Sequence, residues 1–116
     1  MRILIAEDEK NFGFMLSREL SEDGDEVELA SNGIDAVLSF INRPADFVLL
    51  DINLPGLDGI GALRIIKKLA PQTRVLTISG NAGASQVEEA IRFGAAGCLF
   101  KPFAIPALKR EMGILA

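Results

Sequence analysis

The feature that most constrains this chain is a run of four consecutive apolar residues, 47–50, that ends at the carboxylate of Asp51. Apolar residues in an unbroken row predict a strand that is buried on both faces, as strands of parallel sheets are. Pro55 and Gly56 then predict a loop before the next helical pattern. Because ligands of open parallel sheets bind beyond the carboxyl ends of the strands, we expect Asp51 to lie in a functional crevice.

Short apolar segments alternate with helical patterns along the whole chain. The predicted strands are residues 3–6, 26–30, 47–50, 74–78 and 98–100, and the predicted helices are residues 11–23, 33–44, 58–69, 84–93 and from Pro106 onward. The alternation predicts an α/β fold, a three-layer doubly wound sandwich in which right-handed crossovers place helices on both faces of a parallel sheet. Residues 26–30 alternate between polar and apolar, which indicates a half-exposed edge strand.

The helical patterns also predict which side chains face the sheet. The predicted inward residues are Phe12, Leu16 and Leu20 in the first helix, and Ile34, Val37, Leu38 and Ile41 in the second. Phe14 lies roughly 200° round the first helix from Leu16, so we expect Phe14 to face solvent.

The composition excludes several kinds of site. The 116 residues include no histidine, so a histidine general base and a His-ligated zinc site are excluded. A net charge of −4, without a basic stripe in the sequence, argues against nucleic-acid binding. The single cysteine, Cys98, has no partner for an internal disulfide and fits a reducing compartment. No apolar run reaches the roughly 18 residues of a membrane span and no signal peptide opens the chain, so we expect one cytoplasmic domain without a membrane partner.

Polar side chains follow four of the predicted strands. They are Glu7 and Asp8 after the first strand, Asp51 after the third, Ser79 after the fourth and Lys101 after the fifth. Because parallel strands end at one edge of the sheet, we expect these groups to converge on a single crevice. Three adjacent carboxylates repel one another unless they are protonated or bind a cation. Oxygen ligands without histidine or cysteine favour a hard ion, and Mg²⁺ combines a few carboxylates with water and phosphate oxygens.

In these residues and their order the chain resembles the receiver domain of bacterial two-component response regulators. The resemblance covers residues 1–116 as one domain. It rests on the acidic pair Glu7-Asp8, the segment Leu50-Asp51-Ile52-Asn53-Leu54-Pro55-Gly56-Leu57-Asp58-Gly59, the hydroxyl of Ser79, and Lys101-Pro102-Phe103. It implies a flavodoxin-like (βα)5 fold with a five-stranded parallel sheet of order 2-1-3-4-5.

The resemblance implies that Asp51 accepts a phosphoryl group from a sensor histidine kinase or a histidine phosphotransfer protein, as one step of a phosphorelay. A carboxylate can accept this group to give an acyl phosphate. Lys101 and Mg²⁺ would neutralise the transferring group, and Ser79 would donate a hydrogen bond to a phosphoryl oxygen. The implied metal ligands are Glu7, Asp8, Asp51 and the backbone carbonyl of Asn53. The chain would then be a signalling switch, not an enzyme beyond its own phosphorylation and dephosphorylation.

By the same resemblance, the fourth helix, fifth strand and fifth helix present the phosphorylation state to an output domain or effector protein. A homodimer is a further partner that the sequence leaves open. Asn53 and Asn81 flank the site at positions that, in the family, tune how long the phosphoryl group persists. Gly80 either keeps the crevice open to the phosphoryl group or serves a tight turn.

Receivers meet the helix bundle of their kinase through the first helix. The resemblance therefore makes Phe12, Phe14 and Met15 candidates for kinase docking. The alternative for Phe14 is a single exposed apolar residue without a function, which is normal on protein surfaces.

The chain departs from the family three residues before the lysine, where receivers usually carry Tyr or Phe and this chain carries Cys98. In the family this ring couples phosphorylation to the output face, so the strength of the coupling is open here. Ser79 remains as a switch residue that can shift inward, and Phe100 is a candidate replacement for the ring. We expect Cys98 to be buried and inert.

Two other functions compete with this interpretation. One is a receiver-like interaction module that is not regulated by phosphorylation, an alternative that Cys98 keeps open. The other is a phosphatase of the haloacid dehalogenase type, which also uses a strand-end aspartate. That family has a second aspartate two residues on, where this chain has Asn53, and the length leaves no room for a cap domain.

Overall fold

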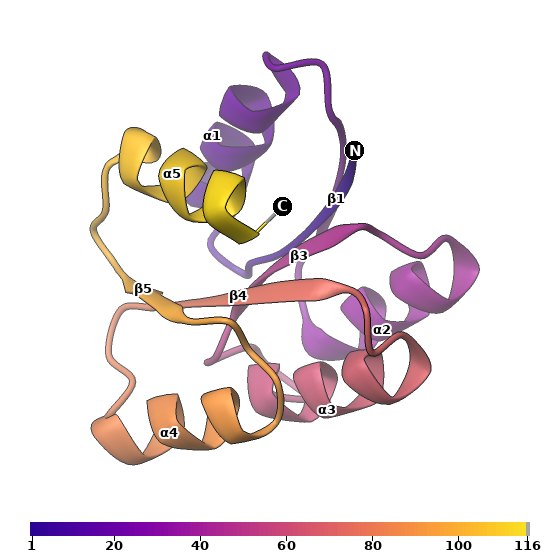
Figure 1. The fold of residues 1–116 in the computed structure, drawn as a ribbon, viewed down its shortest axis with the longest axis vertical. Coiled ribbons are helices and arrows are strands. Elements are labelled where there is room, and N and C mark those ends of the chain that lie inside the picture. The colour runs from indigo at the N-terminus through magenta and orange to yellow at the C-terminus, as the bar shows by residue number, and fades with distance from the viewer. Residues whose placement is uncertain (116) are drawn as a thin grey trace.

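The computed structural model describes residues 1–115, with side chains through Gly113, and its strands form where the sequence has its apolar runs (Figure 1). The strands are β1 (Arg2–Ala6), β2 (Glu26–Ala30), β3 (Phe47–Asp51), β4 (Arg74–Ser79) and β5 (Cys98–Phe100). All neighbouring strands pair in parallel, in the order β2-β1-β3-β4-β5. This confirms the predicted doubly wound α/β fold, and the strand order is that of the flavodoxin-like topology.

Helices connect the strands and cover both faces of the sheet, which gives three layers (Figure 1). Within the described residues the helices are α1 (Lys10–Ser21), α2 (Gly33–Asn42), α3 (Gly59–Leu69), α4 (Ala84–Arg92) and α5 (Ile105–Leu115). Helices α1 and α5 pack on one face, and α2, α3 and α4 pack on the other. Successive strand residues point to opposite faces, so Ile3 and Ile5 of β1 pack toward α1 and α5, whereas Leu4 packs toward α2 and α3.

The inward face of α2 differs from the predicted one. Val37 is buried as predicted, but three of the predicted inward residues are more than half exposed, namely Ile34, Leu38 and Ile41. The buried face instead consists of Gly33, Ala36, Val37 and Phe40. Helix α2 has apolar side chains on more than one side, so two different stripes are compatible with the helical period. The stripe that packs on the sheet is the one whose small residues allow a close approach. A Cβ atom at Gly33 would lie 1.7 Å from the carbonyl oxygen of Leu57.

The helix ends lie within a few residues of the predicted ones. Helix α5 begins at Ile105, one residue before Pro106, and α4 ends at Arg92. Gly94 lies just beyond the C-cap of α4 with a φ of +108°, a left-handed conformation that glycine commonly adopts where a helix ends.

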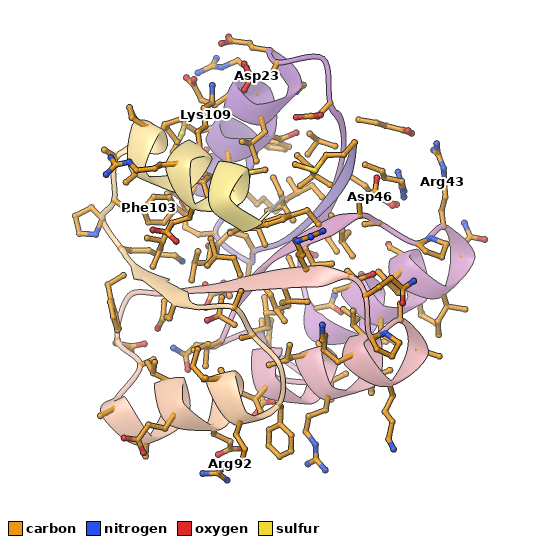
Figure 2. The ribbon with its side chains drawn as sticks, viewed as in Figure 1. Asp23, Arg43, Asp46, Arg92, Phe103 and Lys109 are labelled. Atoms are coloured by element: carbon orange, nitrogen blue, oxygen red, sulfur yellow. The ribbon has the colours of Figure 1, made fainter. Side chains whose placement is uncertain are left out.

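An ion pair of 3.1 Å between Lys109 of α5 and Asp23, just beyond α1, joins the two helices of one face (Figure 2). Among the described helices, none combines the length and the apolar character that crossing a membrane requires.

Candidate functional site

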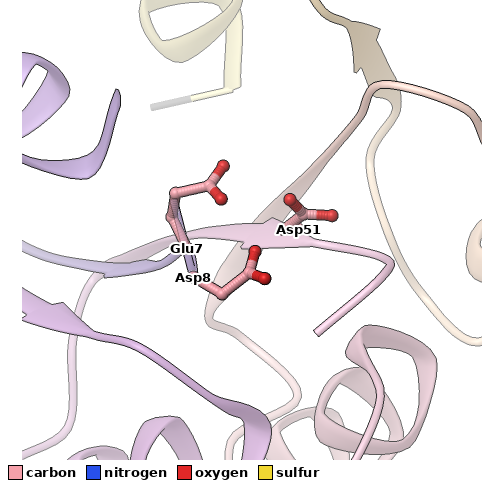
Figure 3. A group of neighbouring side chains, drawn as sticks. All are labelled: Glu7, Asp8 and Asp51. Atoms are coloured by element: carbon pink, nitrogen blue, oxygen red, sulfur yellow. The ribbon is translucent and has the colours of Figure 1, made fainter. Parts of the chain in front are cut away.

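Three carboxylates gather at the edge of the sheet where β1 and β3 end (Figure 3). Glu7 and Asp8 follow β1, and Asp51 is the last residue of β3. One carboxylate oxygen of each residue lies within 4.8 Å of the other two. Glu7 and Asp51 are only 2% and 3% exposed, whereas Asp8 is exposed. The structure therefore brings together the three acidic residues that the sequence places at the ends of two strands.

The connection between β3 and α3 fixes the position of Asp51. A Cβ atom at Gly59, the first residue of α3, would lie 2.1 Å from the carbonyl oxygen of Asp51, so only glycine lets the helix begin this close to the strand. Asp58 caps α3, because its Oδ1 accepts the N–H of Gly61 at 2.8 Å. At the carboxylate itself, Oδ1 of Asp51 accepts the N–H of Asn53 at 2.8 Å.

Lys101 joins two of the carboxylates. Its Nζ lies 2.7 Å from Oδ2 of Asp51 and 2.6 Å from Oε1 of Glu7. The backbone N–H of Lys101 donates to the carbonyl of Ser79 at 2.8 Å, which anchors the residue beside the end of β4. Burial by itself would lower the pKa of Lys101, but the contacts with Asp51 and Glu7 outweigh burial and raise the pKa above its ordinary value. The ammonium therefore stays charged at neutral pH.

The carboxylate of Glu7 is buried, and one of its two oxygens lacks a hydrogen bond. Its Oε2 accepts the backbone N–H of Glu9 at 3.0 Å. Its Oε1 forms an ion pair with Lys101 but receives no hydrogen bond of acceptable geometry. Burial raises the pKa of Glu7 above its ordinary value, against the opposing effects of Lys101 and the Glu9 N–H. A buried, under-coordinated oxygen beside two more carboxylates fits a hard divalent cation, so Glu7, Asp8 and Asp51 are suited to hold Mg²⁺.

The Ser79 hydroxyl is the centre of a polar network beside the carboxylates. Its Oγ accepts the backbone N–H of Ala82 at 2.8 Å and of Asn81 at 3.1 Å, and the side-chain amide of Asn53 at 3.2 Å. The same amide donates to Oδ1 of Asn81 at 2.7 Å. Asn53 thus forms these hydrogen bonds through its N–H and its side chain, and a metal contact of its carbonyl stays a prediction.

The other flanking and switch positions differ in how closely they are packed. A Cβ atom at Gly80 would lie 3.9 Å from Cδ of Lys101, an ordinary contact, so sterics do not require a glycine there. Cys98 pairs with Thr77 and is half-buried, packing against the core on the face of α2, α3 and α4. Phe100 is 53% exposed, so its ring lies largely at the surface.

The three docking candidates on α1 have different surroundings. Phe14 is 63% exposed, as its position on the helix predicts. Met15 is half-buried and packs against the core beneath α1 and α5. The ring of Phe12 packs edge to face on Phe103, with centroids 5.6 Å apart, and lies 5.0 Å from Nζ of Lys101. Phe14 is therefore the candidate that presents its ring mainly to solvent, and docking by these residues stays a prediction.

Two residues contribute to the site without a clear signal in the sequence. Glu9, which the sequence indicates only as a charge at a helix start, is the N-cap of α1 and accepts the N–H of Phe12 at 2.7 Å. Phe103 supports the ring of Phe12 from the segment after β5. The contact of Phe103 with Phe12 depends on a partner that the fold brings in from another element, so local patterns do not reveal it. The cap at Glu9 is a local contact, and an acidic residue at the start of a helical pattern is the signal that could have indicated it.

Comparison with known proteins gives a consistent result. Residues 3–112 match the sequence model of the family described as "Response regulator receiver domain". Chemotaxis protein CheY of Bacillus subtilis (strain 168) is 38% identical over 103 residues, which cover 88% of this chain and 86% of CheY. Regulatory protein AtoC of Escherichia coli (strain K12) is 37% identical over 107 residues, which cover 92% of this chain but 23% of AtoC. The chain thus spans less than a quarter of that relative.

Solved structures agree with the sequence matches. The crystal structure of the receiver domain of NtrX from Brucella abortus is similar to this chain with a TM-score of 0.90 and 33% identity. The match covers 97% of this chain and 96% of that receiver domain.

Proposed function

The chain belongs to the response regulator receiver domain family, and we propose that it is a phosphoacceptor switch in which Asp51 receives a phosphoryl group from a histidine kinase or a histidine phosphotransfer protein. The observation that carries this proposal is the surroundings of the Asp51 carboxylate. It is buried, the ammonium of Lys101 lies 2.7 Å from one oxygen, and two further acidic residues lie beside it. Phosphoryl transfer depends mainly on positioning and on neutralising charge, and these groups can supply both.

In the proposed reaction, a carboxylate oxygen of Asp51 forms the new O–P bond while the P–N bond to the donor histidine breaks, and the electron pair stays with the imidazole. The N–H of Asn53 holds one oxygen of Asp51, and Lys101 neutralises negative charge on the transferring group. Mg²⁺ bound by Glu7, Asp8 and Asp51 would neutralise further charge on the carboxylates and the phosphoryl oxygens.

Ser79 supports the proposal that phosphorylation changes the conformation. Its hydroxyl is engaged by two N–H groups of the loop between β4 and α4, and by Asn53. A phosphoryl oxygen that accepts a hydrogen bond from this hydroxyl would change how it holds the loop, and so bias the face of α4, β5 and α5. With Cys98 at the usual aromatic position, this hydroxyl is the main route from the site to that face.

The proposed activity is limited to phosphorylation and dephosphorylation of the chain itself. An output domain or an effector protein would bind the face of α4, β5 and α5, and a homodimer on this face is part of the same proposal. The domain would act in the cytoplasm, without binding nucleic acid or a membrane itself.

The test is the intact mass of the chain after incubation with acetyl phosphate and Mg²⁺. We expect a gain of one phosphoryl group that hydroxylamine removes, as expected of an acyl phosphate. Asp51→Asn, or chelation of Mg²⁺, should abolish the gain. Glu88→Gln makes the same acid-to-amide change at an exposed residue of α4 and should leave the gain intact.

A folded sample that binds Mg²⁺ but gains no mass would refute the switch. The chain would then be the interaction module that phosphorylation does not regulate. A gain that persists in Asp51→Asn would place the acceptor at another residue.

A further inference from the structure

A closed set of contacts links the start of α1 to Lys101. The N–H of Glu9 donates to Oε2 of Glu7 at 3.0 Å, and the side chain of Glu9 accepts the N–H of Phe12 at 2.7 Å. Nζ of Lys101 lies over the Phe12 ring, 5.0 Å from its centroid, and 2.6 Å from Oε1 of Glu7. The first turn of α1 and the lysine after β5 therefore form one unit around the acidic cluster.

The Phe12 ring is itself held in a defined orientation. Phe103, two residues after Lys101, meets the ring at an interplanar angle of 78° with the centroids 5.6 Å apart. Both rings also pack against the core beneath α1 and α5. A ring that is fixed in this way presents a constant, electron-rich face to the ammonium.

The other contacts of the Lys101 ammonium include one group whose charge changes in the proposed reaction. Among the described residues, its ion pairs are with Asp51 and Glu7. Asp51 is the proposed acceptor, so its charge and hydrogen bonds change when it is phosphorylated. The Phe12 ring is neutral, and its contact with Lys101 does not rely on either carboxylate. Since a lysine side chain is flexible, a contact of this kind limits the positions that the ammonium explores.

We propose that Phe12 is a positioning residue of the phosphoacceptor site. The face of its ring holds the Lys101 ammonium beside Asp51 through a cation–π contact, and this placement speeds phosphoryl transfer. The kinetic part of the inference rests on the function proposed for Asp51, whereas the placement of Lys101 does not. Phe12 thus belongs to the site itself and is more than a candidate for kinase docking.

A role in packing alone predicts a different response to substitution. Fluorine atoms on the ring change its size little but weaken the negative potential of its face, so they reduce cation–π attraction while the core stays filled. Leucine at position 12 also fills space but has no π face. Tyrosine keeps the π face. These changes separate the electrostatic role of the ring from its volume.

The experiment replaces Phe12 in the full chain by phenylalanine with one, two or three ring fluorines, and measures the rate of Asp51 phosphorylation by acetyl phosphate at saturating Mg²⁺. We expect the rate to fall stepwise with fluorination. The total loss, and the loss in Phe12→Leu, should be about twofold to fivefold, the range that a cation–π contact at a partly exposed site supports. Phe12→Tyr should keep most of the rate.

Phe93 provides the matched control. A cation also lies over its ring, with the guanidinium carbon of Arg64 4.4 Å from the ring centroid, and neither residue is a member of the acidic cluster. The same fluorinated series at Phe93 should leave the phosphorylation rate unchanged. A stepwise loss at Phe93 would refute a specific role of Phe12.

A second readout does not require phosphorylation. Protons on Cε of Lys101 that lie over a ring face should be shifted upfield in the NMR spectrum of the unmodified chain, and the shift should disappear in Phe12→Leu. If the shift is absent in the unmodified chain, Lys101 does not lie on the ring and the proposal fails.

The outcomes distinguish this inference from the function on which its kinetic part rests. A rate that is constant across the Phe12 series but lower in Phe12→Leu would show a packing role and refute the cation–π contact. A chain that shows the ring shift but is never phosphorylated would support the placement of Lys101, and would refute both the function of Asp51 and the kinetic part of the inference.

Discussion

At the scale of single residues, Glu7 shows how burial determines the chemistry of the site. Its carboxylate is almost inaccessible, and Lys101 lies 2.6 Å from one of its oxygens. Even so, burial prevails and raises its pKa above the ordinary value of 4.5. Keeping this group ionised without a bound cation therefore costs stability.

The raised pKa of Glu7 predicts that the free energy of unfolding depends on pH. Because the folded-state pKa of Glu7 is raised, its contribution to stability is full below about pH 4.5 and is lost as the pH rises through the folded-state pKa. Glu7→Gln has no such titration. Without Mg²⁺, the free energy of unfolding of the unmodified chain should therefore fall relative to that of Glu7→Gln as the pH rises from about 4.5 toward neutrality.

Urea unfolding across this pH range measures the difference. Lys101, whose pKa is raised above 10.5, does not titrate within it. The free energy of unfolding of Glu88→Gln, a variant at an exposed residue, should change with pH in parallel with that of the unmodified chain. Parallel curves for Glu7→Gln would show that burial does not raise the pKa of Glu7.

At the scale of the elements, α2 shows that a helix can be apolar on more sides than it buries. Its packed face includes Phe40, which is 1% exposed, while Leu38 is 57% exposed. The close approach at Gly33 fixes this rotation of the helix, because the carbonyl of Leu57 occupies the space where a side chain would begin. The exposed apolar residues of α2 therefore contribute little to the core.

This orientation predicts opposite effects for two neighbouring residues. Leu38→Gln should change the free energy of unfolding by no more than about 0.5 kcal/mol, as is usual for a surface substitution. Phe40→Ala should cost about 3–5 kcal/mol, because it leaves a cavity in the core. Urea unfolding of both variants checks the prediction. A large loss for Leu38→Gln would mean that α2 packs with the stripe of Leu38 inward.

At the scale of the whole molecule, charge is distributed unevenly. Residues 1–58 carry thirteen acidic and four basic side chains, whereas residues 59–116 carry three acidic and eight basic ones. The acidic cluster lies in the first half, at the ends of the two strands β1 and β3, which are adjacent in the middle of the sheet. A groove between α3 and α4 is lined by four basic residues, Arg64, Lys67, Lys68 and Arg92. No local stretch of the sequence indicates these four residues as a group.

The position of the acidic cluster predicts that Mg²⁺ stabilises the whole fold. A ligand that binds only the folded state at about 100 times its Kd adds about 2.7 kcal/mol to the free energy of unfolding. Unfolding separates β1 from β3 and destroys such a site. Asp8→Asn removes one carboxylate at an exposed position and should reduce the gain, whereas Glu88→Gln should not.

Thermal unfolding across a Mg²⁺ titration measures this gain. An equal rise in Tm for the unmodified chain and Asp8→Asn would show that Mg²⁺ does not bind at the acidic cluster.

The sequence by itself determined the class of fold and the edge of the sheet at which the site lies. An unbroken apolar run such as residues 47–50 indicates a strand buried on both faces, and parallel strands end on one edge, so the residues that follow them meet there. Both arguments need only local patterns and the geometry of a parallel sheet. Neither argument depends on how the side chains pack.

The tertiary structure alone decided which groups touch. Lys101 reaches Asp51 across 50 residues of chain, and the ring of Phe12 meets Lys101 and Phe103 because α1 and the segment after β5 share one face of the sheet. The rotation of α2 was decided in the same way, by a close contact at Gly33. A periodic pattern shows that a face is apolar, but burial, ion pairing and helix rotation depend on atoms that only packing brings together.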